Sequence, residues 1–314
     1  MLRITSPNGK SQCDVHLHGA HLTSYRCTSP NSSEALNDEV IFVSEKAIFA
    51  TDKAIRGGVP ICFPQFSDKG PLSMSHGFAR NVLWEVVDQK IGSLESVGTL
   101  KMIKSGAYRG QNKDIAKMMA DYDGLDVFLI VSLTDNHLDM SLKVVDATNG
   151  QSTNWDVISS FTFAFHNYFR IGDIRKAHID GVHNNHHHVQ YVDKINKSAT
   201  IIAPSEPIVI SEEVDRVYLD MLDDIRSVIV DESGDSHTTR EIHIDQQANT
   251  AQNVVVWNLW QEKCKKMADM KPEDYEKFVC VEVGQIQTPI KLEKGGEFVA
   301  TQRIYSAYKN NSKL

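Results

Sequence analysis

The chain has 314 residues, of which 41% are hydrophobic and 24% are charged, the proportions of an ordinary soluble protein with a sizeable core. Its 33 basic and 41 acidic residues give a formal net charge of −8. This balance argues against nonspecific nucleic-acid binding, which requires clustered positive charge. An anionic substrate would have to be bound by a few locally placed cations, because the average field repels it.

The cysteines and the apolar runs indicate the cellular compartment of the protein. The chain has five cysteines, an odd number, at Cys13, Cys27, Cys62, Cys264 and Cys280, and no two of them form a C-x-x-C pair. The first residues show no signal-peptide pattern, and no apolar run approaches the about 18 residues of a membrane span. We therefore expect a cytoplasmic protein with free thiols and no membrane segment.

Short apolar runs with a period of two residues recur along almost the whole chain and predict β-strands. These runs are Val40–Val43, Val127–Thr134, Leu138–Val145, Val157–Phe169, Ser227–Asp231, Arg240–Asp245, Val254–Trp260, Phe278–Thr288 and Phe298–Tyr305. Asp135 and Asn136, between two of the runs, predict a tight hairpin turn. Helical patterning is scarce and predicts only Asp114–Tyr122 and Cys264–Phe278, the second limited by Pro272.

Many short strands separated by turn residues indicate an all-β sandwich or barrel. No linker divides the chain, so we predict a single domain over residues 1–314. The polar segments Ser29–Glu39 and Val182–His188 are typical of surface loops. The second contains three adjacent histidines, His186–His188, which could bind a metal ion. Neighbouring residues of an extended chain point in alternating directions, so we interpret this segment as a solvated loop and predict no metal.

The first stretch with an unusual composition runs from residue 54 to residue 85. Arg56 precedes two glycines and two prolines follow, so the backbone can approach a ligand closely and is held rigidly. A rigid loop that presents Arg56 and Arg80 suits an anion, because guanidinium groups match phosphate oxygens. The alternative is that both arginines pair with acidic residues and hold a turn. His76 could hydrogen-bond a sugar hydroxyl or the loop backbone.

A histidine stands on the polar face of a phenylalanine-rich strand. In the run 161–169, His166 shares one face with Thr162 and Ala164, while alternate phenylalanines face the core. Small residues beside a histidine leave room for a ligand. Histidine can transfer a proton near neutral pH because its unperturbed pKa is about 6.5. The alternative is a structural histidine at a sheet surface.

Glu282 interrupts an otherwise apolar strand. It shares a face with Phe278 and Cys280, while valines occupy the other face. A carboxylate in such a run is rarely buried without a partner or a task, so we interpret Glu282 as functional rather than as a residue of a sheet rim. Asp215 could accept hydrogen bonds from sugar hydroxyls, or pair with Arg216 or another cation. No dinucleotide fingerprint, Walker loop, nucleophile elbow or H-E-x-x-H motif is present.

Five motifs, in order, resemble those of the glucose-6-phosphate 1-epimerase (hexose-6-phosphate mutarotase) family of the aldose 1-epimerase superfamily. They are 56–66 with 76–81, 165–169, 214–218, 256–258 and 279–284. The resemblance runs from about Gly19 to Tyr305 and implies an all-β, galactose-mutarotase-like β-supersandwich. It also implies a cofactor-free isomerase that interconverts the α and β anomers of a hexose 6-phosphate.

The resemblance also assigns roles to residues. It implies that His166 is the general acid and Glu282 the general base. The substrate-binding residues that it implies are Arg56, Ser75, His76, Arg80 and Asp215. Arg56 and Arg80 would bind the phosphate and Asp215 the sugar hydroxyls, while Ser75 stands where the family carries a longer glutamine. Nothing in the sequence requires more than a monomer.

Three other functions stay open at the level of sequence. An aldose 1-epimerase for unphosphorylated sugars would use the same acid and base without needing Arg56 and Arg80. A carbohydrate-binding or sensing module could have the fold without the activity, although the presence of both His166 and Glu282 weighs against this. A surface interaction protein could use the histidine-rich loop as a metal or partner site.

Overall fold

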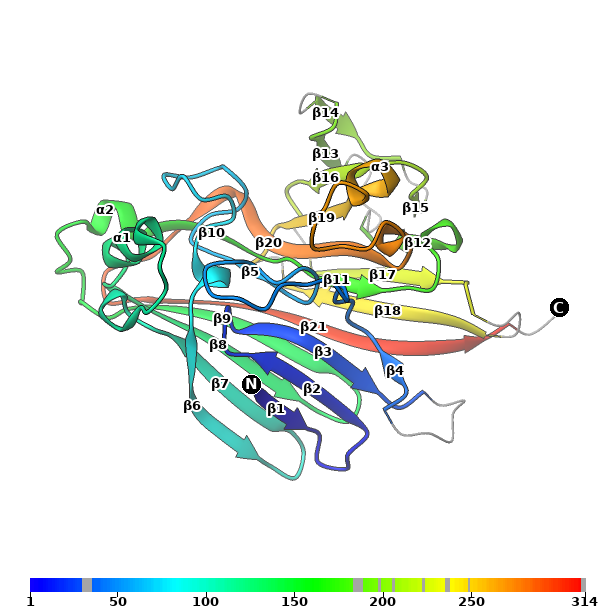
Figure 1. Cartoon of the computed structure of the whole chain (residues 1–314), viewed down its shortest axis with the longest axis horizontal. Helices are drawn as coiled ribbons and strands as arrows, with labels where there is room; N and C mark the ends of the chain where they lie inside the picture. The colour runs from blue at the N-terminus through cyan, green and yellow to red at the C-terminus, as the bar shows by residue number, and fades with distance from the viewer. Residues whose placement is uncertain are drawn as a thin grey trace.

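The computed structural model describes residues 1–29, 36–182, 189–196, 199–204, 207–221, 224–234, 238–247 and 249–311. Within these ranges the chain is built mainly from β-strands, which form sheets of four, eight and nine strands (Figure 1). The all-β prediction is confirmed. None of the helices in the described ranges is both long and apolar enough to span a bilayer. A single domain over residues 1–314 stays a prediction.

In each of the three sheets the paired strands are antiparallel, and the two larger sheets combine strands that are far apart in sequence. The four-stranded sheet has the order β1 (Leu2–Thr5), β2 (Ser11–His16), β3 (His21–Cys27), β4 (Asp38–Glu39). The eight-stranded sheet has the order β14 (Ala199–Ile202), β13 (Gln190–Asp193), β16 (Val214–Tyr218), β19 (Asn253–Asn258), β20 (Phe278–Lys291), β10 (Ser160–Phe165), β5 (Ile61–Cys62), and β11 (Tyr168–Arg170) also pairs with β20. The nine-stranded sheet has the order β15 (Ile208–Val209), β12 (Ala177–Asp180), β17 (Ile225–Asp231), β18 (Thr238–Gln246), β21 (Glu297–Asn310), β9 (Leu138–Asp146), β8 (Leu125–Leu133), β7 (Ser96–Met102), β6 (Trp84–Ile91).

The main hydrophobic core lies between these sheets. Every second residue of β8 and β9 is buried, which is the period that the sequence shows. These residues join one cluster with the phenylalanines of β10 and with Val279, Val281 and Val283 of β20. The four-stranded sheet covers the same core, because β1 packs on β7 and β2 on β8. The opposite face of the eight-stranded sheet does not pack on this core.

Short helical segments connect the strands. They are α1 (Lys113–Asp121), α2 (Trp155–Ile158), α3 (Trp260–Cys264) and the 3₁₀ turns η1 (Ala79–Asn81), η2 (Ser105–Ala107), η3 (Ile174–Lys176) and η4 (Asp274–Glu276). The predicted helix Asp114–Tyr122 is confirmed as α1, which the Asn112 side chain caps by accepting from the N–H groups of Asp114 and Ile115.

The predicted helix Cys264–Phe278 is wrong. The chain is helical before this segment, in α3, and then only in the short turn η4. Pro272 supplies no N–H group, and the Asp274 carboxylate accepts from the Lys271 N–H and from the Ser44 hydroxyl. These contacts with distant residues hold a turn where local propensity favours a helix.

Seven of the nine predicted strand runs are strands, and Asp135-Asn136 is the turn between β8 and β9. The run Val40–Val43 is wrong as a strand, because Ile41 and Val43 form only isolated bridges with Phe169 and Gly57. The run Val157–Phe169 is divided into α2, β10 and β11. The predicted loop Ser29–Glu39 ends in β4, and its residues 30–35 lie outside the described residues.

Arg240 of β18 links all three sheets. Its Nη2 lies 2.7 Å from Oδ1 of Asp38 in β4, and Nη1 donates to the carbonyl of Arg170 in β11 at 2.7 Å. The two charged side chains are only 12% and 6% exposed. Arg240→Met leaves the Asp38 charge buried and unpaired, so we expect the free energy of unfolding to fall by about 3–5 kcal/mol. Urea denaturation measures this loss.

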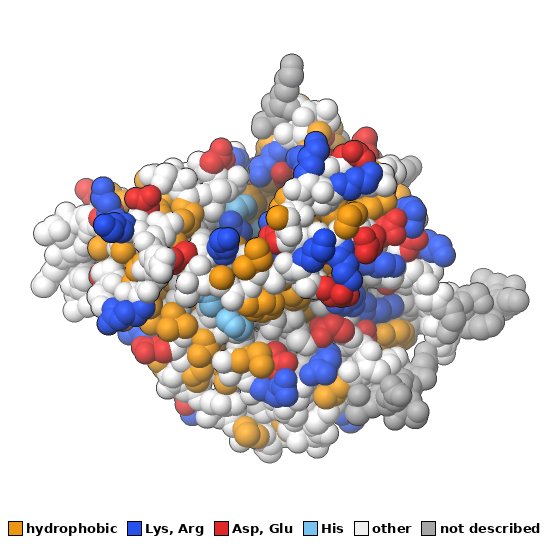
Figure 2. All heavy atoms as spheres, viewed as in Figure 1, with side chains coloured by type: hydrophobic (Ala, Val, Ile, Leu, Met, Phe, Trp, Pro, Cys, Tyr) orange, Lys and Arg blue, Asp and Glu red, His pale blue; other side chains and the backbone are white. Residues whose placement is uncertain are grey.

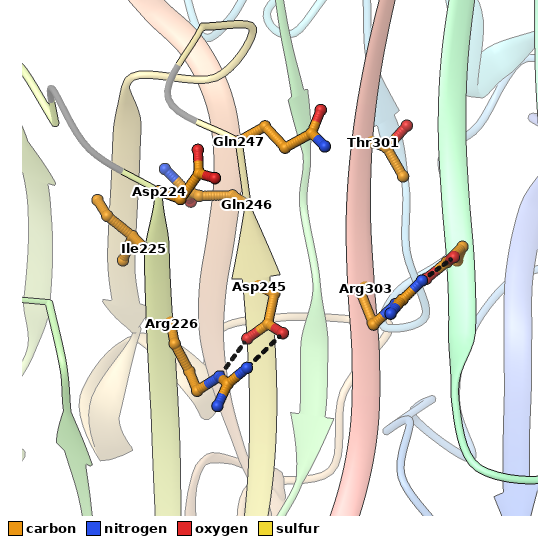
Figure 3. Close-up of a pocket in the computed structure, with 9 residues that line it drawn as sticks. Asp224, Ile225, Arg226, Asp245, Gln246, Gln247, Thr301 and Arg303 are labelled. Atoms are coloured by element: carbon orange, nitrogen blue, oxygen red, sulfur yellow. Dashed lines mark hydrogen bonds and ion pairs between the residues drawn. The ribbon is translucent and has the colours of Figure 1, made fainter.

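Arg226 offers a matched control on the outer face of the same sheet. Its guanidinium donates to both carboxylate oxygens of Asp245, at 2.7 and 3.1 Å (Figure 3). This pair is exposed to 58% and 29%, so Arg226→Met should cost about 1 kcal/mol or less. Similar small losses in the two variants would contradict a structural role for the Arg240 contacts.

Candidate active site

A cavity of about 220 Å³ lies on the face of the eight-stranded sheet that points away from the main core. Six of the seven residues predicted for the site line it: Arg56, His76, Arg80, His166, Asp215 and Glu282. They come from loops and strands spread over more than 200 positions of the sequence. The pairing of β16, β19, β20 and β10 brings them together.

Strand parity and register place the two central residues. Val281 and Val283 point into the main core, so Glu282 between them points into the cavity. Phe165 pairs with Val283, which brings the next residue, His166, beside Glu282. The chain is held at this point because Asn167 Nδ2 donates to the Val281 carbonyl at 2.9 Å. The histidine is therefore fixed by its neighbours on both strands.

His166 and Glu282 form a close, buried pair. Nδ1 of His166 lies 3.3 Å from Oε1 of Glu282, and the side chains are 10% and 2% exposed. The two atoms lack the alignment of a hydrogen bond. Nδ1 of His166 and Oε2 of Glu282 have no hydrogen-bond partner among the described residues. Buried polar atoms without partners are rare in proteins, and both of these residues line the cavity.

The surroundings shift the pKa values of both groups. Burial lowers the pKa of His166 well below its usual value, and His76, Arg80 and Arg56 lower it further. Burial raises the pKa of Glu282 well above its usual value, and the Asp215 charge adds to this. Both shifts favour the neutral forms of the two side chains. A buried acid/base pair with such opposed shifts is typical of a catalytic site.

Two arginines bring positive charge to the cavity. Nε of Arg56 lies 3.1 Å from Oδ2 of Asp269, and Nη1 donates to the Tyr168 hydroxyl at 3.3 Å. Nη2 of Arg80 donates to the Ser75 carbonyl at 3.2 Å, while Nε of Arg80 has no hydrogen-bond partner within the described ranges. Arg80 therefore retains donor capacity for an anion.

Ser75 is the one predicted site residue that does not line the cavity. It is exposed, and the contact it makes toward the site is through its backbone carbonyl, which holds Arg80. Serine is too short to reach from this position into the site. A role in positioning Arg80 fits the geometry better than direct substrate contact.

His76 and Asp215 also line the cavity. Nδ1 of His76 accepts from the Ser67 N–H at 3.2 Å, so the ring proton of the neutral imidazole resides on Nε2, which can donate to a ligand. Burial lowers the pKa of His76 well below its usual value, and Arg80 adds to this. Burial raises the pKa of Asp215, although Lys194, with Nζ at 3.6 Å from Oδ1, opposes that shift.

The prediction of site residues omitted Tyr168, Trp257 and Lys194, which also line the cavity. The Tyr168 ring stacks on His166 with centroids 4.9 Å apart, and the Trp257 ring meets the His166 ring edge-on with centroids 5.9 Å apart. Strand parity could have identified both aromatics. Tyr168 is two residues from His166, and Trp257 is two residues from Val255, which also lines the cavity. Lys194 follows β13 in a turn, and no pattern in the sequence marks it.

One set of side chains in the described ranges could hold a metal ion. The donor atoms of His166, Cys280 and Glu282 lie within 4.8 Å of one another. The histidines His186–His188 lie outside the described residues, so the interpretation of that segment stays a prediction.

The comparison with known families shows which family this chain belongs to. The sequence model described as aldose 1-epimerase matches residues 2–305. The chain belongs to the aldose 1-epimerase family. A protein of Cenchrus ciliaris, provisionally named a glucose-6-phosphate 1-epimerase, is 30% identical over 299 residues, which are 94% of this chain and 82% of the relative. An Escherichia coli K12 protein with the same provisional name is 28% identical over 280 residues, covering 88% and 81%.

Solved structures confirm the galactose-mutarotase-like fold that the resemblance implies for this aldose 1-epimerase family member. A protein of Salmonella typhimurium, provisionally named a mutarotase, superposes with a TM-score of 0.75 at 24% identity, covering 96% of this chain and 88% of that one. A galactose mutarotase-like protein of Lactobacillus casei superposes with a TM-score of 0.65 at 15% identity, covering 98% and 100%. The predicted family and isomerase class are confirmed.

Proposed function

We propose that this protein is a hexose-6-phosphate mutarotase that interconverts the α and β anomers of glucose 6-phosphate and similar sugars. The observation that carries the proposal is the buried His166–Glu282 pair, which lines one cavity together with Arg56 and Arg80. The provisional names of the curated relatives support the same activity.

In the proposed mechanism, Glu282 takes the proton of the C1 hydroxyl while His166 protonates the ring oxygen. The hemiacetal opens to an aldehyde, rotation about the C1–C2 bond presents the other carbonyl face, and reversal of both transfers closes the ring. Each positioned proton transfer contributes roughly 10²–10⁴-fold to the rate. The 3.3 Å separation lets the two groups act on neighbouring atoms of one sugar.

The other residues of the cavity bind the sugar phosphate in this proposal. Arg80 and Arg56 face the phosphate, because guanidinium groups pair with its oxygens and the chain as a whole repels anions. Asp215 accepts from sugar hydroxyls, and Nε2 of His76 donates to one. Because burial favours the neutral form of both groups, a proton passed from Glu282 to His166 across their 3.3 Å contact gives the carboxylate and the imidazolium that the mechanism uses, and bound phosphate favours that imidazolium by offsetting the arginine charges.

The proposal includes a cytoplasmic monomer with no nucleic-acid or membrane partner and no cofactor. All five cysteines are free thiols, which supports a reducing compartment. Acidic and basic side chains are interspersed over the face in Figure 2. This mixed surface supports a small-molecule substrate rather than a polyanion.

Exchange NMR of glucose 6-phosphate and of free glucose, at matched concentrations, tests the proposed function. We expect the protein to accelerate anomerisation of the phosphorylated sugar by at least about tenfold more than that of glucose, because only the phosphate uses the arginines. Equal acceleration of both sugars would instead favour an aldose 1-epimerase for unphosphorylated substrates. Binding without acceleration would favour a sugar-binding or sensing module.

A further inference from the structure

Cys280 is a buried thiol that the proposed mechanism does not use. It lies on the same face of β20 as Glu282, two residues away, and its side chain is fully buried. Its sulfur lies within 4.8 Å of donor atoms of both His166 and Glu282. A thiol, an imidazole and a carboxylate therefore lie close together, and the last two belong to residues that line the cavity.

We propose that His166, Cys280 and Glu282 form an inhibitory site for a soft divalent cation, specifically Zn²⁺. The ion binds to the atoms that the acid and the base need and so excludes the sugar. The inhibition rests on the proposed function, whereas the binding of the ion does not.

The geometry fits tetrahedral zinc. Zn–N and Zn–O bonds of about 2.1 Å give a tetrahedron with an edge of about 3.4 Å between ligand atoms. Nδ1 of His166 and Oε1 of Glu282 are already 3.3 Å apart. The sulfur lies within 4.8 Å of donor atoms of both residues and has to approach to about 3.6 Å to complete a third corner, which leaves the fourth corner for water.

The chemistry of the donors favours zinc over harder ions. Sulfur, imidazole nitrogen and carboxylate oxygen are the usual ligands of Zn²⁺, while Mg²⁺ requires oxygen ligands in octahedral geometry. Nδ1 of His166 and Oε2 of Glu282 lack other partners within the described ranges, so the ion displaces no protein hydrogen bond there. Burial raises the pKa of both the Cys280 thiol and Glu282, and the metal ligands are the thiolate and the carboxylate, so binding releases both protons to solvent.

The charges balance at this site. The nearby cations Arg56, Arg80 and Lys194 repel a metal ion. The thiolate and the Glu282 carboxylate together carry two negative charges, which neutralise Zn²⁺ at direct contact. Contact distances near 2 Å outweigh the longer-range repulsion, because Coulomb energy falls with separation.

Cobalt(II) titration of the chelator-treated protein tests the binding. We expect the absorption band of a thiolate-to-cobalt bond, and zinc binding by calorimetry at a stoichiometry of one. Cys280→Ala should abolish the band and weaken zinc binding by at least about tenfold. Cys264→Ala is the matched control, because Cys264 is a buried cysteine of the same apolar cluster and should leave both readouts unchanged.

The activity assay tests inhibition separately. Zn²⁺ should inhibit anomerisation by at least about tenfold, chelator should restore it, and Mg²⁺ should have no effect. Cys280→Ala, or Cys280→Ser if alanine impairs folding, should remain active and resist zinc. An absent cobalt–thiolate band, or equal zinc inhibition of wild type and Cys280→Ala, would overturn the inference. A thiolate band in a protein without mutarotase activity would overturn the proposed function alone and support the metal site.

Discussion

Replacing Glu282 with glutamine should lower the rate of glucose 6-phosphate anomerisation by about 10²–10⁴-fold, and replacing His166 with alanine should do the same. Each variant removes one of the two proton-transfer groups that lie 3.3 Å apart in the cavity. The double variant should be little slower than either single one, because the two groups act as a unit. Exchange NMR at saturating substrate gives the rates.

Folding should be retained in the Glu282→Gln variant. Burial already disfavours the charged carboxylate, as the raised pKa of Glu282 indicates, so a neutral amide of the same shape should leave the melting temperature unchanged or higher. His243 offers a control, since its Nε2 lies 3.1 Å from Glu241 in a second His–Glu pair on the nine-stranded sheet. His243→Ala should keep full activity. Near-normal rates in both cavity variants would rule out the acid and base roles.

Replacing Arg80 with methionine should lower kcat/KM for glucose 6-phosphate by about 10- to 100-fold, because a hydrogen bond to a charged group contributes about 1.5–3 kcal/mol. Arg80 is the better arginine to replace, since its buried Nε lacks a partner among the described residues, while Arg56 is bound by Asp269 and Tyr168. The rate with free glucose should change by no more than about threefold, since that sugar has no phosphate.

The comparison of the two sugars distinguishes phosphate recognition from general damage. Arg303→Met is the matched control, because Arg303 pairs with Asp139 on the outer face of the nine-stranded sheet (Figure 3). It should leave both substrates unaffected. If Arg80→Met reduced kcat/KM equally for glucose and glucose 6-phosphate, Arg80 would not bind the phosphate.

Local patterning was sufficient for much of this molecule. The period of two residues in β8 and β9 is visible in the sequence because one face of each strand packs on the core. The same parity placed Glu282 opposite the valines of β20, and the structure has this arrangement. The helix α1 was predictable because its amphipathic period and its Asn112 cap lie within the segment itself.

Tertiary structure decided the features that depend on distant partners. The distant Ser44 hydroxyl donates to Asp274 in a turn where the sequence favours a helix, and Ser75 lies outside the cavity and contacts Arg80 through its carbonyl. Lys194 reaches the site from a turn that no periodicity marks. Hydrogen bonds and loop paths of this kind join residues far apart in the chain, and a sequence period reports only the burial of its own strand or helix.

The His166–Glu282 pair depends on both the sequence pattern and the tertiary structure. The sequence by itself determined that each residue stands on the non-core face of a strand, because alternation follows from the geometry of an extended backbone. It did not determine that β10 and β20 are neighbours in the sheet, which places the two residues side by side. The pairing of Phe165 with Val283 in the eight-stranded sheet sets these positions, and it depends on both strands burying their alternate residues in the same core.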